Sequence, residues 1–324
     1  MIIDYCQAKD IHIAETGGET IPLQALLKKG RTYPLFKGYI SNNFLALDNY
    51  TKKQYQNKTA IKNSITHVIY INNEPSISLT TCPNQWLSNH YGFPIGNLHY
   101  AITNNSTSQK NITRLFMTHL AAAKSHFNLI ITTLPAEEIT LNKAALQNGF
   151  NLMTTRERYL ISREEYEPVA LRHRALPYDQ GHDEKIKQLL SETSFPSHFS
   201  NDPRLDKDKT NEMYAEWMLK ETNKTMKSVI YRSENLVGAA SIQLDLHSNT
   251  KGLPSTYKSS LIATKFGHLG VAYSLVAYGL NKGLEIADYA EFIVSHEVTA
   301  LTRILKKLGM QYTGTENVLH FWAN

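Results

Sequence analysis

A glycine-containing turn near residue 267 carries the residue pattern with the clearest chemical meaning. In the segment TKFGHLGVAYSLVAYGL, Gly267 and Gly270 follow a strand-like stretch, and Ala272 opens a helix-like one. Small residues between a strand and a helix let consecutive backbone N–H groups converge on an anion, assisted by the positive end of the helix dipole. The turn lacks the third glycine of dinucleotide-binding motifs and the GK[ST] of P-loops. The residues of the turn alone favour a structural glycine turn before a core helix, with a pyrophosphate site as the alternative that the rest of the chain must support.

Both halves of the chain end with the same order of elements, which places this turn inside a repeated unit. In the first half, a helix-like stretch (111–127) leads to the strand NLIITTL, the segment KAALQNGF and the strand LMTTRERYLIS. In the second half, the helix GVAYSLVAYGLNKG leads to YAEFIVS, LTRILKKLGM and QYTGTENVLHFW. A charged, poorly patterned segment joins the halves. We interpret the repetition as a duplicated α/β unit, with domains over residues 1–165 and 175–324.

Hydrophobic periodicity predicts the elements of the second half. Three strands are expected over KSVIYRS, LVGAASIQLDL and YKSSLIAT, followed by a helix from about residue 271. An earlier helix that carries Met213 and Tyr214 is predicted to be capped by Asp206. The fold class expected is α/β (α+β), with tandem units built on a mixed, mostly antiparallel central sheet flanked by helices.

Composition excludes several classes of protein. The 324 residues are 42% hydrophobic and 19% charged, which is typical of a globular chain and not of a disordered one. We expect a cytoplasmic protein without a membrane span, because no apolar run is long enough and no secretory signal is recognisable. Cys6 and Cys82 are predicted to be buried thiols, and no metal site is expected. A net charge of +5 without a basic cluster suits a phosphorylated small molecule and does not favour nucleic acid.

Several segments resemble the GNAT superfamily of acyl-CoA-dependent N-acyltransferases. In that superfamily the turn reads [RQ]-x-x-G-x-[GA] and binds the pyrophosphate of CoA; here Gly270 and Ala272 match, whereas Gly267 replaces Arg or Gln. The KLGM ending of the second half is similar to the superfamily's KLGF. Two further segments, NHYGFPIGNL (89–98) and FPSHFSNDPRLDKDKTNEMYAEWM (195–218), are similar to segments of the TDP-fucosamine acetyltransferases, a sugar-nucleotide group.

The resemblance implies acetyl-CoA as co-substrate and a nucleotide-linked amino sugar, of the 4-amino-4,6-dideoxyhexose type, as acceptor in surface polysaccharide synthesis. It also implies that the first half is a degenerate copy that does not bind CoA. The residues expected to bind CoA lie at the end of a strand and in the turn after it: Leu261, Ile262, Ala263, Thr264, Gly267, His268, Leu269, Gly270, Val271 and Ala272.

Acyl transfer from a thioester needs a neutral amine, a polarised carbonyl and a leaving thiolate. An amine with a pKa near 8 is already about one-tenth neutral at pH 7, so a strong general base is dispensable. A backbone N–H on the strand before the turn could polarise the carbonyl. The superfamily's tyrosine acid is missing, because its position falls on Leu305, or on Ile304 in the adjacent register. The substitutes we expect are His296, Ser295 and Tyr273. Alternatively, His296 is a surface residue, Tyr273 is a packing residue, and the enzyme is slower than one that has the tyrosine.

Aromatic and polar side chains in the two signature segments could bind a sugar nucleotide. Arg204 could meet a diphosphate in a bidentate way, and an aromatic face could stack on a pyrimidine. The alternative is that the aromatic residues form an interface between the halves. The substrate-binding residues expected are His198, Phe199, Arg204 and Tyr91, with Phe93, Asp202, Tyr214 and Trp217 as further candidates.

Two other functions stay open. The acceptor could be a peptide, polyamine or antibiotic amine, although the weak positive charge and the absence of an acidic cluster argue against polycationic acceptors. The departures at Gly267 and Leu305 would also fit a non-catalytic acyl-CoA-binding module. The sequence leaves the oligomeric state open, with a homodimer as one candidate.

Overall fold

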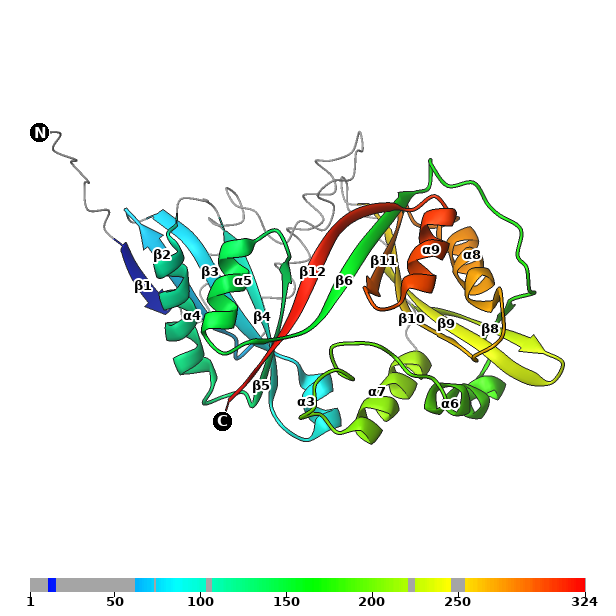
Figure 1. The fold of residues 1–324 in the computed structure, drawn as a ribbon, viewed down its shortest axis with the longest axis horizontal. Coiled ribbons are helices and arrows are strands. Elements are labelled where there is room, and N and C mark those ends of the chain that lie inside the picture. Colours follow the sequence, from blue (N-terminus) through cyan, green and yellow to red (C-terminus); the bar gives the residue numbers. More distant parts are fainter. Residues whose placement is uncertain are drawn as a thin grey trace, which may run out of the picture. The chain divides into compact units, whose positions relative to one another are not determined.

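The structure is a computed structural model, which describes residues 11–15, 62–72, 74–102, 107–220, 225–245 and 254–323. Figure 1 shows the order of the elements along the chain. The chain divides into two compact units. Of the described residues, unit 1 comprises 11–15, 62–72, 74–102, 107–152 and 317–323, and unit 2 comprises 153–220, 225–245 and 254–316.

The borders between the units fall inside two long strands, β6 (Asn151–Ser162) and β12 (Gln311–Trp322). The domain border expected at 165–175 differs from this division, because residues 153–165 belong to unit 2 and residues 317–323 to unit 1. Hydrophobic alternation marks a strand, but it does not say which neighbours each half of a long strand pairs with.

Unit 1 is built on an antiparallel meander that continues into a parallel pair. Its elements are β1 (Ile11–Glu15), β2 (Ile65–Ile71), β3 (Glu74–Pro83), α3 (Gln85–Tyr91), β4 (Ile95–Ile102), α4 (Gln109–Ala123), β5 (Leu129–Pro135) and α5 (Ile139–Gln147). Strands β1 to β4 pair antiparallel in sequence order, whereas β4 and β5 are parallel. The end of β12 adjoins β5, and directly after it the Ala323 N–H donates to the Asn128 C=O at 2.9 Å.

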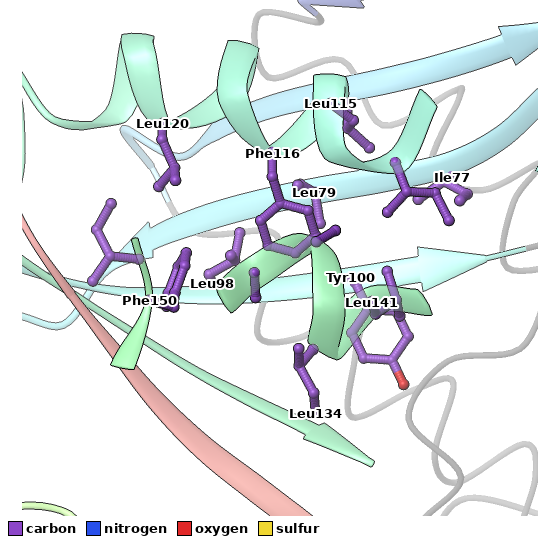
Figure 2. Close-up of a cluster of buried hydrophobic side chains, with 14 of the residues drawn as sticks. Ile77, Leu79, Leu98, Tyr100, Leu115, Phe116, Leu120, Leu134, Leu141 and Phe150 are labelled. Carbon is purple, nitrogen blue, oxygen red and sulfur yellow. The ribbon is translucent and has the colours of Figure 1, made fainter. Parts of the chain in front are cut away.

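Helix α4 covers this sheet because its apolar residues recur at helical spacing. Its N-terminus is capped by Ser108, whose hydroxyl accepts the Asn111 N–H. Figure 2 shows the resulting core, in which Phe116 lies over Leu79 of β3. The labelled side chains, all at most 5% exposed, are Ile77, Leu79, Leu98, Tyr100, Leu115, Phe116, Leu120, Leu134, Leu141 and Phe150.

Unit 2 repeats the meander and the parallel pair. After β6 its elements are β7 (Leu176–Pro177), a 3-10 turn (Gln180–His182), α6 (Asp183–Ser191), α7 (Lys207–Leu219), β8 (Thr225–Arg232), β9 (Asn235–Asp245), β10 (Thr256–Thr264), α8 (Val271–Gly283), β11 (Tyr289–Ser295) and α9 (Thr299–Lys307). Strands β8, β9 and β10 are antiparallel, β10 and β11 are parallel, and β11 pairs antiparallel with β6. Helices α8 and α9 cover one face of this sheet, and α6 and α7 the other (Figure 1).

The short helices α5 and α9 end in the same way, which explains the repeated glycine and large apolar residue in the sequence. The Phe150 N–H donates to the Ala145 C=O, and the Met310 N–H donates to the Leu305 C=O, both at 3.1 Å. This hydrogen bond across a glycine is that of a Schellman motif. Both Phe150 and Met310 are buried. The duplicated α/β unit expected from the sequence is confirmed.

Three further expectations concern a helix cap, the two cysteines and membrane-spanning helices. Asp206 caps α7, as expected, by accepting the Lys209 N–H at 2.8 Å. Cys82 is a buried free thiol, whereas Cys6 lies outside the described residues. None of the helices in the described ranges is both long and apolar enough to cross a membrane.

Candidate functional site

Strands β10 and β11 pair over three residues only and then part. Their parallel ladder ends at Lys258 opposite Glu291, although β10 continues to Thr264 and β11 to Ser295. On its other side β10 stays paired with β9 up to its end. Residues 259–264 therefore present a strand edge that faces no partner on β11.

Two amides on that edge point toward the diverging strand. The Lys265 N–H donates to a β9 carbonyl at 2.9 Å, and donors in an antiparallel pair alternate between the two sides. The amides of Thr264 and Ile262 therefore point away from β9, whereas that of Ala263 points toward it. A register shift just before Leu261 marks the start of this stretch. Of the four strand residues expected to bind CoA, Ile262 and Thr264 offer a backbone donor here.

The turn after β10 leaves the first amides of α8 open. Gly270, with a φ of +83°, is the N-cap and has no side chain that could accept a hydrogen bond. Within the described part of the chain, no acceptor meets the backbone N–H groups of residues 268–270, 272 and 273. In unit 1, by contrast, Ser108 caps the equivalent helix. Open amides at the positive end of a helix dipole suit a phosphate group. Among the described residues, the start of α8 in unit 2 presents such amides.

The side chains of this turn leave its backbone accessible. Phe266 is 100% exposed and Leu269 is 89% exposed. Nothing lies within 4 Å of the position that a Cβ on Gly267 would take. The turn is therefore not filled by its own side chains.

Tyr273 lies in a packing position. Its ring is partly buried against the core of unit 2. The Arg172 guanidinium carbon lies 5.0 Å from the ring centroid, and Lys307 Nζ lies 5.9 Å from it. The ring thus packs at the first turn of α8 with two cations near it, which agrees with the alternative interpretation of this residue.

His296 pairs with a carboxylate that sequence reasoning missed. Its Nδ1 lies 3.1 Å from Glu157 Oε1, and its side chain is 70% exposed. The Tyr159 O–H donates to Glu157 Oε2 at 2.6 Å. This hydrogen bond, followed by the interactions with His296, holds the pKa of Glu157 below its usual value, although burial opposes the shift. An ionised Glu157 orients the imidazole with a proton on Nδ1 and leaves Nε2 for proton transfer.

Ser295 points to the other face of the sheet. Phe292 and Val294 belong to the core beneath α8 and α9, so Ser295 does not share their face because strand side chains alternate. Its Oγ lies 3.3 Å from Thr154 Oγ1, and the residue is buried. The three predicted catalytic residues therefore have separate surroundings.

A buried charge network holds the strands where β10 and β11 part. Arg158 of β6 bonds to Glu291 of β11 and to Glu316 of β12, the latter at 2.6 Å. Lys258 Nζ lies 3.7 Å from Glu291 Oε2, and Arg156 also reaches Glu316. Arg158 and both glutamates are at most 4% exposed. Because a buried charge loses its hydration, each member depends on its partners, and the network fixes the positions of four strands.

The loop between α6 and α7 contacts both β6 and the segment that follows β11. Asn201 Nδ2 donates to the Met153 C=O at 3.0 Å and to Glu297 Oε1 at 3.1 Å. The loop predicted to bind the acceptor is therefore fixed beside the residues that follow Ser295. Asn201 was not among the expected site residues, although it stands inside the signature segment.

The substrate-binding candidates on this loop differ in exposure. Phe199 is buried, and the ring of His198 lies against it with the centroids 3.9 Å apart. Arg204 is exposed, and its N–H donates to the buried carboxylate of Asp202 at 3.0 Å. His198 is half-buried and Arg204 is exposed, whereas Phe199 and Asp202 are buried within the loop. On α7, Tyr214 is buried and Trp217 is 37% exposed.

Tyr91 belongs to unit 1, where it forms part of the core. It is 4% exposed, and its ring centroid lies 5.9 Å from that of Phe93, which in turn lies 5.4 Å from Trp322. Gly92, in the left-handed region, ends helix α3. In unit 1 the NHYGFPIGNL segment therefore forms the end of helix α3 and contributes to a row of packed aromatic rings.

Comparisons with solved structures identify the fold. The chain is similar to a GCN5-related N-acetyltransferase from Sphaerobacter thermophilus, with a TM-score of 0.59 and 10% identity over 97% of this chain and 96% of that one. It is also similar to a tandem GNAT protein from the clavulanic acid biosynthesis pathway, with a TM-score of 0.51 and 10% identity over 97% and 99% of the two chains. No family model and no curated protein matches the sequence. The chain thus has the tandem GNAT fold, which confirms the expected fold class.

Proposed function

We propose that the protein is a CoA-dependent N-acyltransferase with acetyl-CoA as its donor. The observation that carries this proposal is the combination, in unit 2, of the parted strands β10 and β11 with open amides at the start of α8. An extended ligand fits along the free edge of β10, and the amides of the turn bind the diphosphate of that ligand.

The residues of this site fit CoA. Nothing lies within 4 Å of the position that a Cβ on Gly267 would take, so a phosphate can approach the turn there, and the exposed Phe266 and Leu269 leave its amides accessible. Bound acetyl-CoA supplies an acetyl group activated as a thioester. The Ile262 N–H donates to the thioester carbonyl and polarises it. His296, oriented by Glu157, keeps a proton on Nδ1 and donates the one on Nε2 to the leaving thiolate, and Nε2 then takes up the proton that the acylated nitrogen loses.

The buried carboxylates near the apex of the parted strands do not act as bases. Glu291 and Glu316 are held by Arg158, so their negative charge is already stabilised. The neutral fraction of the amine is therefore the nucleophile, and the reaction speeds up as the pH rises toward the pKa of the amine.

For the acceptor, we infer a nucleotide-linked amino sugar of the 4-amino-4,6-dideoxyhexose type. The similarity of the 195–218 segment to sugar-nucleotide acetyltransferases supports this inference. So does the hydrogen bond from Asn201 to Glu297, which keeps the loop beside the end of β11. His198 supplies a polar ring and Arg204 an exposed guanidinium for the diphosphate.

Release of free thiol from acetyl-CoA tests the proposal. The protein is incubated with acetyl-CoA and a panel of TDP- and UDP-linked amino sugars, peptides, polyamines and aminoglycosides. We expect CoA release above background with an amino-sugar nucleotide. Release with another amine only would keep the acyltransferase and reject the sugar acceptor, and no release with any amine would reject the enzyme.

A second candidate function is an acyl-CoA-binding module without catalysis. The observation in its favour is that Leu305, at the position of the superfamily's tyrosine, is 0% exposed and belongs to the core. Titration calorimetry separates the two functions, since binding of acetyl-CoA without turnover of any amine would support the module.

A further inference from the structure

Residues 166–173 form a strap along helix α8. The strap is part of the charged segment that joins the two halves, for which the sequence pattern predicted no structure. Asn281 Oδ1 accepts the Tyr166 O–H at 2.7 Å and the Val169 N–H at 3.2 Å, and Asn281 Nδ2 donates to the Val169 C=O at 3.0 Å. One amide side chain of α8 thereby fixes the first half of the strap.

The second half of the strap ends on the turn proposed to bind phosphate. Ser274 Oγ accepts the Arg172 N–H at 3.1 Å and the His173 N–H at 2.9 Å. The His173 Nε2–H donates to the Leu269 C=O at 2.8 Å. A Cβ on Gly270 would lie 3.2 Å from both Arg172 Cδ and His173 Nε2. Both side chains therefore lie against the backbone of the turn.

The strap brings a cation to this turn without an acid to neutralise it. Within the described residues, no carboxylate forms an ion pair with Arg172 or with Lys307. Both cations lie over the ring of Tyr273, in the first turn of α8, although they come from different elements. Two uncompensated positive charges beside open amides favour an anionic ligand. The turn itself offers no cation at Gly267.

We propose that Arg172 binds the diphosphate of CoA, and that the strap thereby supplies from outside the turn the cation that Gly267 lacks. The inference rests on the proposed function. The guanidinium donates two parallel hydrogen bonds to phosphate oxygens, and the open amides of the turn bind the remaining oxygens. His173 is a positioning residue that holds the Leu269 carbonyl and, through it, the turn.

Titration calorimetry with three probes tests this assignment: CoA, CoA without its 3′-phosphate, and pantetheine, which has no phosphate. In Arg172→Ala we expect the affinity for CoA and for 3′-dephospho-CoA to fall by the same factor, about 10- to 100-fold. The affinity for pantetheine stays that of the unchanged protein. Arg172→Lys keeps the charge but loses the bidentate geometry, so we expect a smaller loss.

Arg174→Ala is the matched control, because it removes an exposed arginine of the same region that contacts nothing in the turn. We expect its affinity for CoA to stay within about twofold, which is below the 1.4 kcal/mol of a tenfold change. Circular dichroism checks that each variant is folded.

Three results would overturn the assignment. Unchanged affinity in a folded Arg172→Ala would remove Arg172 from the site, and a gain in affinity would mean that its side chain plugs the turn. A loss confined to CoA, with 3′-dephospho-CoA unaffected, would move Arg172 to the 3′-phosphate. The proposed function fails in a distinguishable way, because the unchanged protein would then bind none of the three probes.

Discussion

Lys258 and Glu291 form the last pair of the parallel ladder between β10 and β11, and their side chains lie 3.7 Å apart as an ion pair. This pair stands at the apex of the parted strands. Glu291 is 2% exposed and is also held by Arg158. The angle at which β10 and β11 diverge therefore depends on a buried charge network. The geometry of the candidate site depends on that network in turn.

Removing one charge from this network should destabilise unit 2 strongly. Glu291→Gln leaves Arg158 buried with one of its two carboxylates, and breaking a buried ion pair costs about 3 to 5 kcal/mol. Urea unfolding measures the loss. The control is Glu184→Gln, which breaks the exposed pair with Lys187 and should leave the unfolding curve unchanged. Equal curves for the two variants would show that the network contributes no stability.

Acid should destabilise unit 1 through a buried histidine. His119 Nε2 lies 2.7 Å from Thr81 Oγ1, and its Nδ1 lies 3.2 Å from His67 Nδ1. Burial, together with His67, lowers the pKa of His119 to about 3. Between about pH 6.5 and about pH 3 the unfolded chain binds a proton at this residue that the folded chain does not. The contribution of the neutral His119 to the free energy of unfolding is therefore fully present above about pH 6.5. It falls by about 1.4 kcal/mol for each unit of pH below that value.

Urea unfolding between pH 7 and pH 4 measures this slope. In His119→Gln the free energy of unfolding should depend less steeply on pH, by the contribution of one proton, because glutamine does not titrate. The exposed His126 gives the matched control, since His126→Gln should keep the full slope. The same steep slope in His119→Gln would assign the acid sensitivity to other groups.

If His296 supplies the acid, its removal should slow turnover without affecting the binding of acetyl-CoA. We expect His296→Ala to lower kcat by about 100-fold, the lower end of what general acid catalysis contributes. Glu157→Gln should lower kcat less, because the imidazole stays in place but loses the carboxylate that orients it. Steady-state kinetics and calorimetry check this, with His126→Ala as control. An unchanged kcat in His296→Ala would exclude the residue as the acid.

The two glycines of the turn should respond differently to alanine. Both have a φ of +83°, so a Cβ costs about 1 to 2 kcal/mol of backbone strain at either position. At Gly267 the new methyl group meets nothing, whereas at Gly270 it would press on Arg172 and His173. We therefore expect similar losses of melting temperature but a larger loss of CoA affinity in Gly270→Ala. Equal affinities would show that the contact between the strap and Gly270 is irrelevant to the cofactor.

Local sequence patterns were sufficient to predict the repeat and most elements of unit 2. The glycine endings of α5 and α9, the cap at Asp206 and the periodicity of α8 depend only on residues close in sequence. The ends of the domains were not predictable in this way. They depend on which sheet each part of β6 and β12 joins, which is decided by contacts between segments far apart in the chain.

The candidate site was predictable where it consists of backbone. The glycine turn and the strand before it were found from residue types alone, because an anion-binding turn needs small residues at fixed positions. Side chains that act in pairs were missed. Glu157 and His296 are 139 residues apart, and Arg158 stands in an alternating charged stretch that resembles a solvent-facing strand. Its burial follows only when β11 and β12 bring their glutamates beside it.

The passage of β12 into unit 1 has a consequence for biosynthesis. Residues 317–323 complete unit 1 beside β5, yet a ribosome makes them only after the whole of residues 153–316. A nascent chain must therefore carry β5 as an exposed sheet edge throughout the translation of unit 2, and such edges invite mispairing. No single proteolytic cut can therefore release either unit intact.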